Sequence, residues 1–277
     1  YGIISARDES SPLLLPFEEN STVVTMGKST SNIIRAKRMI GGNGGSIGAI
    51  LTNRIFDNAG DMTTAGLDFH LHPGSNIHIT LHGTASIHNE SDNFEYIYDQ
   101  STNDYPSTFD DGKYTKTFDG EKITGNALGF AINYRDRTDD YGVVLRLRSP
   151  GFRTSNGFEK NNSTKWLKAG RGKTVYYDNH PKLLKTKYNI ETIYKTNYTG
   201  VIKKQELSLS TSSDLKNGDF FKLSGELEKE NFRGIQFDNL YEFEFGYRNQ
   251  INSSLKVYNE LQSRKIIVRN LDNPRSS

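Results

Sequence analysis

Hydrophobic and polar residues alternate strictly along residues 67–88. The odd positions are apolar or small: Leu67, Phe69, Leu71, Ile77, Ile79, Leu81, Gly83, Ala85 and Ile87. The even positions are polar: Asp68, His70, His72, His78, Thr80, His82, Thr84, Ser86 and His88. Because successive side chains of a β-strand point to opposite sides, this pattern predicts two strands that each have one apolar and one polar face. Residues 73–76 (PGSN) are typical of a turn, so the two strands are expected to form a hairpin.

The same alternation recurs along most of the chain. Its clearest instances are 128–135, 141–148, 221–228, 241–248 and 255–261. Weaker strands are expected near 31–38, 46–54, 93–99, 172–178, 183–197 and 200–212, and the polar stretches 99–124 and 149–165 are expected to be long loops. No segment shows a convincing helical period. We therefore predict an all-β chain of roughly a dozen strands in an antiparallel up-and-down meander, forming a single domain over 1–277.

Composition narrows the chemistry. The chain of 277 residues has 15 Tyr and 15 Phe, and this aromatic content argues against disorder. No apolar run approaches the ~18 residues of a membrane-spanning helix, whereas the ~9–11 residues of a membrane-spanning β-strand fit within the alternating segments. The formal net charge of +2 is too balanced to indicate a nucleic-acid partner. The absence of Cys excludes disulfides, thiol chemistry and cysteine-ligated metals.

The position of the aromatic residues distinguishes two all-β architectures. In a soluble β-sandwich the apolar faces pack on a second sheet, whereas in a membrane β-barrel they contact lipid. Amphipathic rings at both rims are favoured at a lipid interface, and closure of a barrel removes exposed strand edges. The rings at expected strand ends are Tyr134, Tyr141, Phe220, Phe221, Tyr241 and Tyr247. The favoured prediction is a transmembrane β-barrel or a large fragment of one, with a soluble β-sandwich or open barrel as the alternative.

Three segments near the start of the chain carry a family resemblance: 32–38 (NIIRAKR), 44–54 (GGSIGAILTNR) and 65–69 (AGLDF). Together they resemble the C-terminal β-barrel domain, of unknown function, of Gram-negative outer-membrane proteins that carry an N-terminal domain similar to family 9 carbohydrate-binding modules. Looser counterparts of later motifs in that family are Tyr134-Arg135 and Gly151-Phe152-Arg153, or Gly157-Phe158. The similarity is best over 30–90 and becomes generic barrel patterning beyond 170.

The resemblance implies a bacterial outer-membrane location and a binding module upstream of this chain. Because the chain opens at Tyr1 in strand-like sequence without an initiator Met, we expect it to be a piece of a longer protein. Some relatives are labelled membrane-associated hydrolases, but none of their catalytic residues maps onto this chain. The resemblance therefore indicates a location and an architecture without indicating an active site.

Five of the six histidines crowd the hairpin 67–88 on its polar face. If His72 lies opposite His78, then Asp68 lies opposite His82. Imidazole is the commonest metal ligand, so His72 and His78 are candidates for a metal site. The alternative, which we favour, is that these are ordinary water-facing positions. The histidines that are candidates for lining a lumen or binding a ligand are His70, His72, His78 and His82.

Two arginines are further candidates. Arg146 and Arg148 share the polar face of the expected strand 141–148, and such residues can line a constriction that selects anions. The favoured alternative is that they pair with lumen glutamates such as Glu242 and Glu244. Carboxylates also suggest a glycosidase, but two carboxylates one residue apart are the ordinary result of alternation, so no catalytic residue is assigned.

The sequence thus predicts an outer-membrane β-barrel protein with a pore, transport or surface-anchoring role. The first alternative is a protein that binds carbohydrate or another polymer through a module located upstream, and the second is a membrane-associated hydrolase. The expected partner is outer-membrane lipid, with carbohydrate added under the binding alternative. No cofactor and no nucleic acid are expected.

Overall fold

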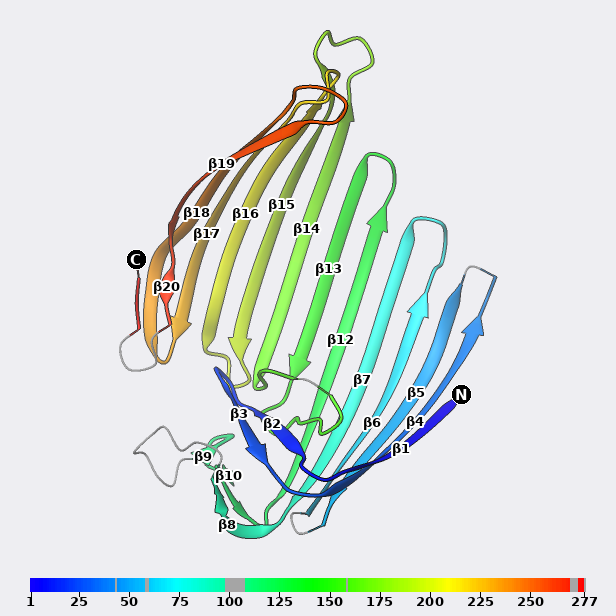
Figure 1. Cartoon of the computed structure of the whole chain (residues 1–277), viewed down its shortest axis with the longest axis vertical. Coiled ribbons are helices and arrows are strands. Elements are labelled where there is room, and N and C mark those ends of the chain that lie inside the picture. The colour runs from blue at the N-terminus through cyan, green and yellow to red at the C-terminus, as the bar shows by residue number, and fades with distance from the viewer. Residues whose placement is uncertain (43, 58–59, 98–107, 158, 270–273, 277) are drawn as a thin grey trace. The chain divides into compact units, whose positions relative to one another are not determined.

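The chain is all-β. The computed structural model describes residues 1–42, 44–57, 60–97, 108–157, 159–269 and 274–276, and within these ranges it contains strands and no helix. None of the described residues belongs to a helix long and apolar enough to span a membrane. Thirteen strands form one antiparallel sheet in the order β1-β4-β5-β6-β7-β12-β13-β14-β15-β16-β17-β18-β19 (Figure 1). Neighbours in this order follow each other along the chain apart from inserted short strands, which confirms the predicted up-and-down meander.

The long strands account for most of the described chain. The large sheet consists of β1 (Gly2–Asp8), β4 (Ser29–Ile40), β5 (Gly45–Phe56), β6 (Gly60–Leu71), β7 (Ile77–Glu90), β12 (Lys122–Arg135), β13 (Asp139–Arg148), β14 (Thr164–Tyr176), β15 (Leu183–Asn197), β16 (Ile202–Leu215), β17 (Phe220–Phe232), β18 (Ile235–Gln250) and β19 (Lys256–Lys265). The short strands are β2 (Pro12–Pro16), β3 (Ser21–Thr25), β8 (Asp92–Ile97), β9 (Thr108–Phe109), β10 (Tyr114–Thr115), β11 (Thr117–Asp119), β20 (Ile267–Val268) and β21 (Arg275–Ser276).

The short strands pair among themselves, as β2 with β3, β8 with β11, β9 with β10 and β20 with β21. The strand expected near 93–99 is therefore not a member of the meander: its described part, up to residue 97, pairs with β11 instead. Residues 98–99 lie outside the described residues, as does Phe158 of the looser Gly157-Phe158 counterpart. The expected loop 99–124 contains β9, β10 and β11 in its described part.

Apolar side chains form rows across neighbouring strands. Leu227 of β17 lies opposite Leu207 of β16 and opposite Tyr241 of β18. Leu223 and Leu227 are 53% and 57% exposed. Ser224 and Glu226 point to the other face, because successive side chains of a strand alternate. The sheet thus keeps the predicted apolar face, and these rows are open to the surroundings.

The chain divides into two compact units, each described by itself. Unit 1 comprises Tyr1–Ala131, Leu145–Lys165 and Asn197–Gly200, and unit 2 comprises Ile132–Val144, Trp166–Thr196 and Val201–Ser277. The prediction of a single barrel domain over 1–277 stays a prediction.

Unit 1 has a hydrophobic core outside the apolar rows. Leu13 and Leu15 of the β2–β3 hairpin pack with Phe56 of β5, Met62 of β6 and Phe118 of β11. Figure 1 shows the short strands β2, β3 and β8–β10 gathered near one end of the long strands β5, β6 and β7. Because the residues from β5 and β6 are even-numbered, this core lies on the polar face of the sheet. The hairpin and β11 therefore cover part of that face.

Unit 2 has a smaller core near the end of its last strands. Phe232 closes β17, Phe237 and Leu240 belong to β18, and Ile267 belongs to β20. Leu223 and Leu227 are not members of either core.

Candidate functional site

The histidine hairpin has the predicted register. In the β6–β7 pair, Asp68 lies opposite His82 and Leu71 lies opposite Ile79, so His72 and His78 face each other across the turn. Their rings meet edge to face, with centroids 4.6 Å apart and an interplanar angle of 76°. The alternation and the turn residues were therefore sufficient to predict this pairing.

The hairpin histidines do not converge in groups of three. Thr80 Oγ1 lies 3.5 Å from His70 Nδ1, and Asp68 Oδ2 lies 3.7 Å from His70 Nε2. Among the described residues, no group of three metal-ligating side chains includes one of these histidines. Metal binding by His72 and His78 stays a prediction.

Two glycines leave room for charged and polar side chains on this face. A Cβ at Gly48 of β5 would lie 2.6 Å from Arg35 Nη2 and 2.8 Å from Asp68 Oδ1, and these two side chains form an ion pair 2.5 Å long. A Cβ at Gly129 of β12 would lie 2.0 Å from the ring of His82. Both glycines are therefore required by close approach of neighbouring side chains across the sheet.

The structure corrects the predicted partner of Arg148, whereas the pairing of Arg146 stays a prediction. Arg148 pairs with Glu159 of the 149–163 loop at 3.0 Å, whereas the partner of Glu244 is Lys222 on the adjacent strand at 2.7 Å. Each charged group pairs with a neighbour in its own unit, a loop carboxylate for Arg148 and a cross-strand lysine for Glu244. Burial raises the pKa of Glu159, although Arg148 and Arg146 act in the opposite direction.

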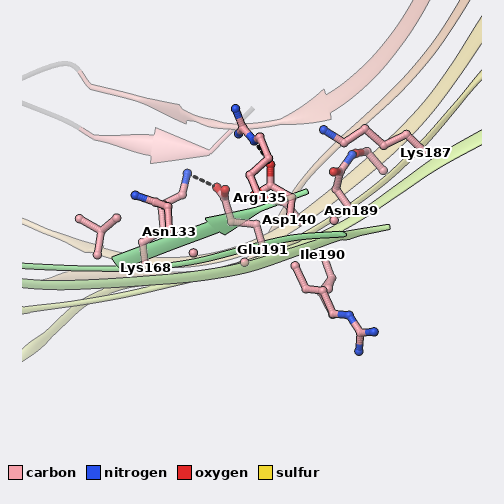
Figure 2. Close-up of a pocket in the computed structure, with 15 residues that line it drawn as sticks. Asn133, Arg135, Asp140, Lys168, Lys187, Asn189, Ile190 and Glu191 are labelled. Carbon is pink, nitrogen blue, oxygen red and sulfur yellow. Dashed lines mark hydrogen bonds and ion pairs between the residues drawn. The ribbon is translucent and has the colours of Figure 1, made fainter. Parts of the chain in front are cut away.

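Unit 2 carries a polar groove of about 500 Å³ on its part of the sheet. Lys168 and Glu191 form an ion pair of 2.5 Å there, and Arg135 Nε lies 2.7 Å from Asp140 Oδ2. Figure 2 shows these charged side chains on one side of the strands, while Ile190 points to the other side. The groove thus follows the alternation and offers both charges together with amide and hydroxyl groups. Its polar neighbours from β12, β15 and the adjacent β16 are Asn133, Lys187, Asn189, Ser208 and Ser210.

Ion pairs continue along the later strands of unit 2. Lys204 contacts Glu206 at 2.7 Å and Glu228 at 3.1 Å. The Lys204 side chain is 29% exposed, whereas those of Glu206 and Glu228 are only 8% and 15% exposed, so water reaches this cluster mainly through the ammonium. These pairs balance part of the negative charge on the polar face of unit 2.

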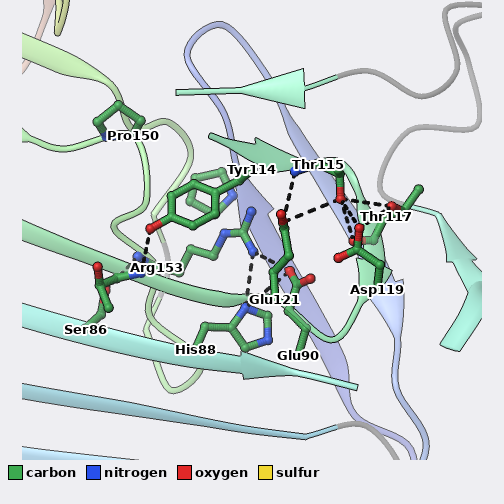
Figure 3. Close-up of polar contacts among 12 residues, drawn as sticks. Ser86, His88, Glu90, Tyr114, Thr115, Thr117, Asp119, Glu121, Pro150 and Arg153 are labelled. Carbon is green, nitrogen blue, oxygen red and sulfur yellow. Dashed lines mark hydrogen bonds and ion pairs between the residues drawn. The ribbon is translucent and has the colours of Figure 1, made fainter. Parts of the chain in front are cut away.

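Unit 1 instead buries a charged cluster under its hairpin (Figure 3). Arg153, in the 149–163 loop, is fully buried and donates from Nη1 to Glu90 Oε1 and His88 Nδ1, both at 3.1 Å. Its backbone N–H donates to Ser86 Oγ at 3.2 Å. Since a guanidinium offers only donors, His88 accepts at Nδ1 and carries its proton on Nε2.

The aromatic surroundings suit a buried guanidinium. The Arg153 Cζ atom lies 5.1 Å from the Phe109 ring centroid and 5.9 Å from that of Phe17. Burial lowers the pKa of Arg153 to about 10, and the neighbouring Glu90 opposes this shift. The guanidinium therefore stays charged at neutral pH, and its Nη1 donates to the Glu90 carboxyl group.

Glu90 also belongs to a group of three carboxylates with Asp119 of β11 and Glu121. Sequence reasoning missed this group and the burial of Arg153, because Asp119, Glu121 and Arg153 are distant from Glu90 in sequence and meet it only at the end of β7. The one available signal was the apolar run 13–15 within an otherwise polar segment, which could have indicated a buried insert.

Comparisons of the chain with models of protein families, with curated proteins and with solved structures find no match. The family resemblance of the segments 32–38, 44–54 and 65–69 therefore stays a prediction.

Proposed function

We propose that the chain is an outer-membrane β-barrel, or a large fragment of one, that anchors in lipid through its apolar face and has a partly covered polar interior. Its role is transport or surface anchoring. The observation that supports this most directly is the set of exposed apolar rows on consecutive strands.

The rows resemble a lipid-facing surface in chemistry. A monomeric soluble protein rarely exposes a contiguous apolar patch of more than a few hundred Å², and larger patches mark membrane or protein contacts. Here exposed apolar side chains recur on most long strands of both units; examples are Ile34, Leu51, Leu67, Leu128, Leu167, Ile190, Leu209, Leu223, Phe243 and Leu261. A soluble sandwich would require a second sheet over these rows, and the hydrophobic cores of the described residues lie elsewhere.

The rings near the strand ends also favour a membrane. Tyr134 and Tyr141 flank the β12–β13 turn with ring centroids 5.9 Å apart, and the Tyr134 hydroxyl donates to Asp136 at 2.7 Å. Tyr247 lies near the C-terminal end of β18, and its hydroxyl donates to Asp219 at 3.0 Å. Rings with a polar tip bonded to turn residues match the aromatic girdles of outer-membrane barrels.

In unit 1 the covered polar face favours a plugged interior over an open pore. The β2–β3 hairpin and the Arg153 loop bury apolar and charged groups on that face. Outer-membrane barrels with loops inside the lumen are plugged in this way. The groove of unit 2, by contrast, stays accessible at about 500 Å³.

Reconstitution of the whole chain into lipid vesicles tests the proposal. We expect insertion, measured as co-flotation with vesicles and protection of the strands from added protease, and little steady conductance across a planar bilayer. Failure to insert would contradict the membrane role, whereas insertion with a large steady conductance would contradict only the covered interior. The carbohydrate-binding and hydrolase alternatives gain no specific support from the described residues.

A further inference from the structure

We propose that Glu90, Asp119 and Glu121 form a binding site for a hard divalent cation of the Ca²⁺ class. The site goes beyond the membrane role and does not depend on it. Each residue offers one carboxylate oxygen, and the three oxygens lie within 4.8 Å of one another. Ca²⁺ binds oxygens at about 2.3–2.6 Å, so oxygens on opposite sides of one ion are separated by about twice that distance.

Unsatisfied oxygens point to a missing ligand. The Glu90 side chain is 0% exposed. Its Oε2 atom and the buried Oδ1 atom of Asp119 have no hydrogen-bond partner among the described residues. A buried carboxylate oxygen without a partner is costly, and this cost is removed when the oxygen ligates a cation. Figure 3 shows the carboxyl groups of Glu90, Asp119 and Glu121 turned toward one another.

The local charge also favours a divalent cation. The described cation bonded to this group is Arg153, which donates to Glu90 Oε1 and leaves its other oxygen available. Three carboxyl groups lie near one guanidinium, so acidic side chains outnumber basic ones at this site. A bound divalent cation would balance this excess.

Neighbouring groups hold the carboxylates in place and can add oxygen ligands. Thr115 Oγ1 donates to Asp119 Oδ2 at 2.7 Å, and the Thr115 backbone N–H donates to Glu121 Oε2 at 2.9 Å. The Thr117 hydroxyl lies 2.9 Å from that of Thr115. Hydroxyl and carboxylate oxygens without nitrogen or sulfur ligands are typical of Ca²⁺ and Mg²⁺ sites.

A cation at this site would link the short strand β11 to the end of the long strand β7. Glu90 is the last residue of β7, and Asp119 follows Phe118, which is fully buried in the hydrophobic core of unit 1. One ion bound to both would fasten β11 to the long strand and stabilise the cover of the polar face.

A second acidic group provides the control. Glu206, Glu226 and Glu228 also lie within 4.8 Å of one another, but Lys204 contacts two of them. An ammonium already occupies the position that a metal would take, so we expect no tight Ca²⁺ binding there.

Calorimetric titration of the detergent-solubilised whole chain with Ca²⁺ tests the site. We expect one saturable site whose affinity falls by at least about tenfold in Glu121→Gln and in Asp119→Asn, while Glu226→Gln leaves it unchanged. Both amides can still accept the Thr115 hydrogen bonds, so the fold is retained, and far-UV circular dichroism checks this. Absence of saturable binding to the unaltered chain, or equal affinity in folded Glu121→Gln, would overturn the proposal.

Discussion

Unit 1 and unit 2 use the polar face of the sheet in different ways. In unit 1 inserted segments cover that face and bury Arg54 and Arg153. In unit 2 the charged side chains form ion pairs that stay partly exposed, such as Arg135 with Asp140, whose side chains are 75% and 31% exposed. The same alternating sequence pattern thus leads to two different energetic situations, because what covers the face decides how much each charge contributes.

Burial makes the charges of unit 1 depend on their partners. Arg54 donates from Nε to Ser29 Oγ at 2.9 Å, from Nη1 to the Ser155 carbonyl at 3.1 Å and from Nη2 to Asp8 at 3.2 Å. Removing one member of such a buried network leaves the rest desolvated and unpaired. In unit 2, water can replace a lost partner.

The largest difference in the loss of stability is expected between Arg153→Met in unit 1 and Arg135→Met in unit 2. Replacing Arg153 removes the buried donor to both Glu90 and His88, so the free energy of unfolding should fall by about 3–5 kcal/mol. Replacing Arg135 removes an exposed pair and should change it by about 0–1 kcal/mol. Urea unfolding in lipid vesicles, followed by far-UV circular dichroism, measures both. Equal losses would show that the cover of unit 1 does not bury the cluster.

A slightly smaller difference in the loss of stability is expected between Leu15→Ala in unit 1 and Leu209→Ala in unit 2. Leu15 is fully buried in the core of unit 1, so its truncation leaves a cavity and should cost about 2–5 kcal/mol. Leu209 belongs to an exposed row, where lipid tails can fill the space, so its truncation should cost less. The same urea titrations compare the two variants. A larger loss for Leu209→Ala would mean that protein packs against the exposed row.

The smallest effect is expected at the β12–β13 turn of unit 2. The backbone N–H groups of Asp139 and Thr138 and the Tyr134 hydroxyl donate to Asp136, and they lower its pKa from 3.8 to about 2. Because the pKa is lower in the folded state, the stabilisation is present above pH 3.8 and disappears as the pH falls through about 2.

Asp136→Ala should therefore lower the urea midpoint slightly at pH 7 and by much less at pH 2, where about half of the folded molecules carry a protonated Asp136. A difference between the variant and the unaltered chain that persists undiminished at pH 2 would mean that the carboxylate charge is not what the turn uses. The matched replacement Asp140→Ala, in the exposed pair with Arg135, controls for the loss of a nearby negative charge.

Much of the sheet could be predicted from the sequence, because alternation is a local property of a strand. It predicted the meander, the two faces and the pairing of His72 with His78. The covered polar face could not be predicted in this way. Glu90 and Arg153 are 63 positions apart and meet through segments whose polar residues resemble surface loops. The predicted partner of Arg148 was wrong for the same reason, because its actual partner, Glu159, lies in such a polar loop.

The most direct test concerns what covers the apolar rows. The chain has no Cys, so single Cys substitutions at positions 222–228 of β17 can each carry one nitroxide label in lipid vesicles. If lipid covers the rows, oxygen accessibility should peak at 223, 225 and 227, and accessibility to a water-soluble nickel chelate should be lowest there. A flat profile, or peaks of the nickel chelate at 223 and 227, would contradict a lipid-facing sheet.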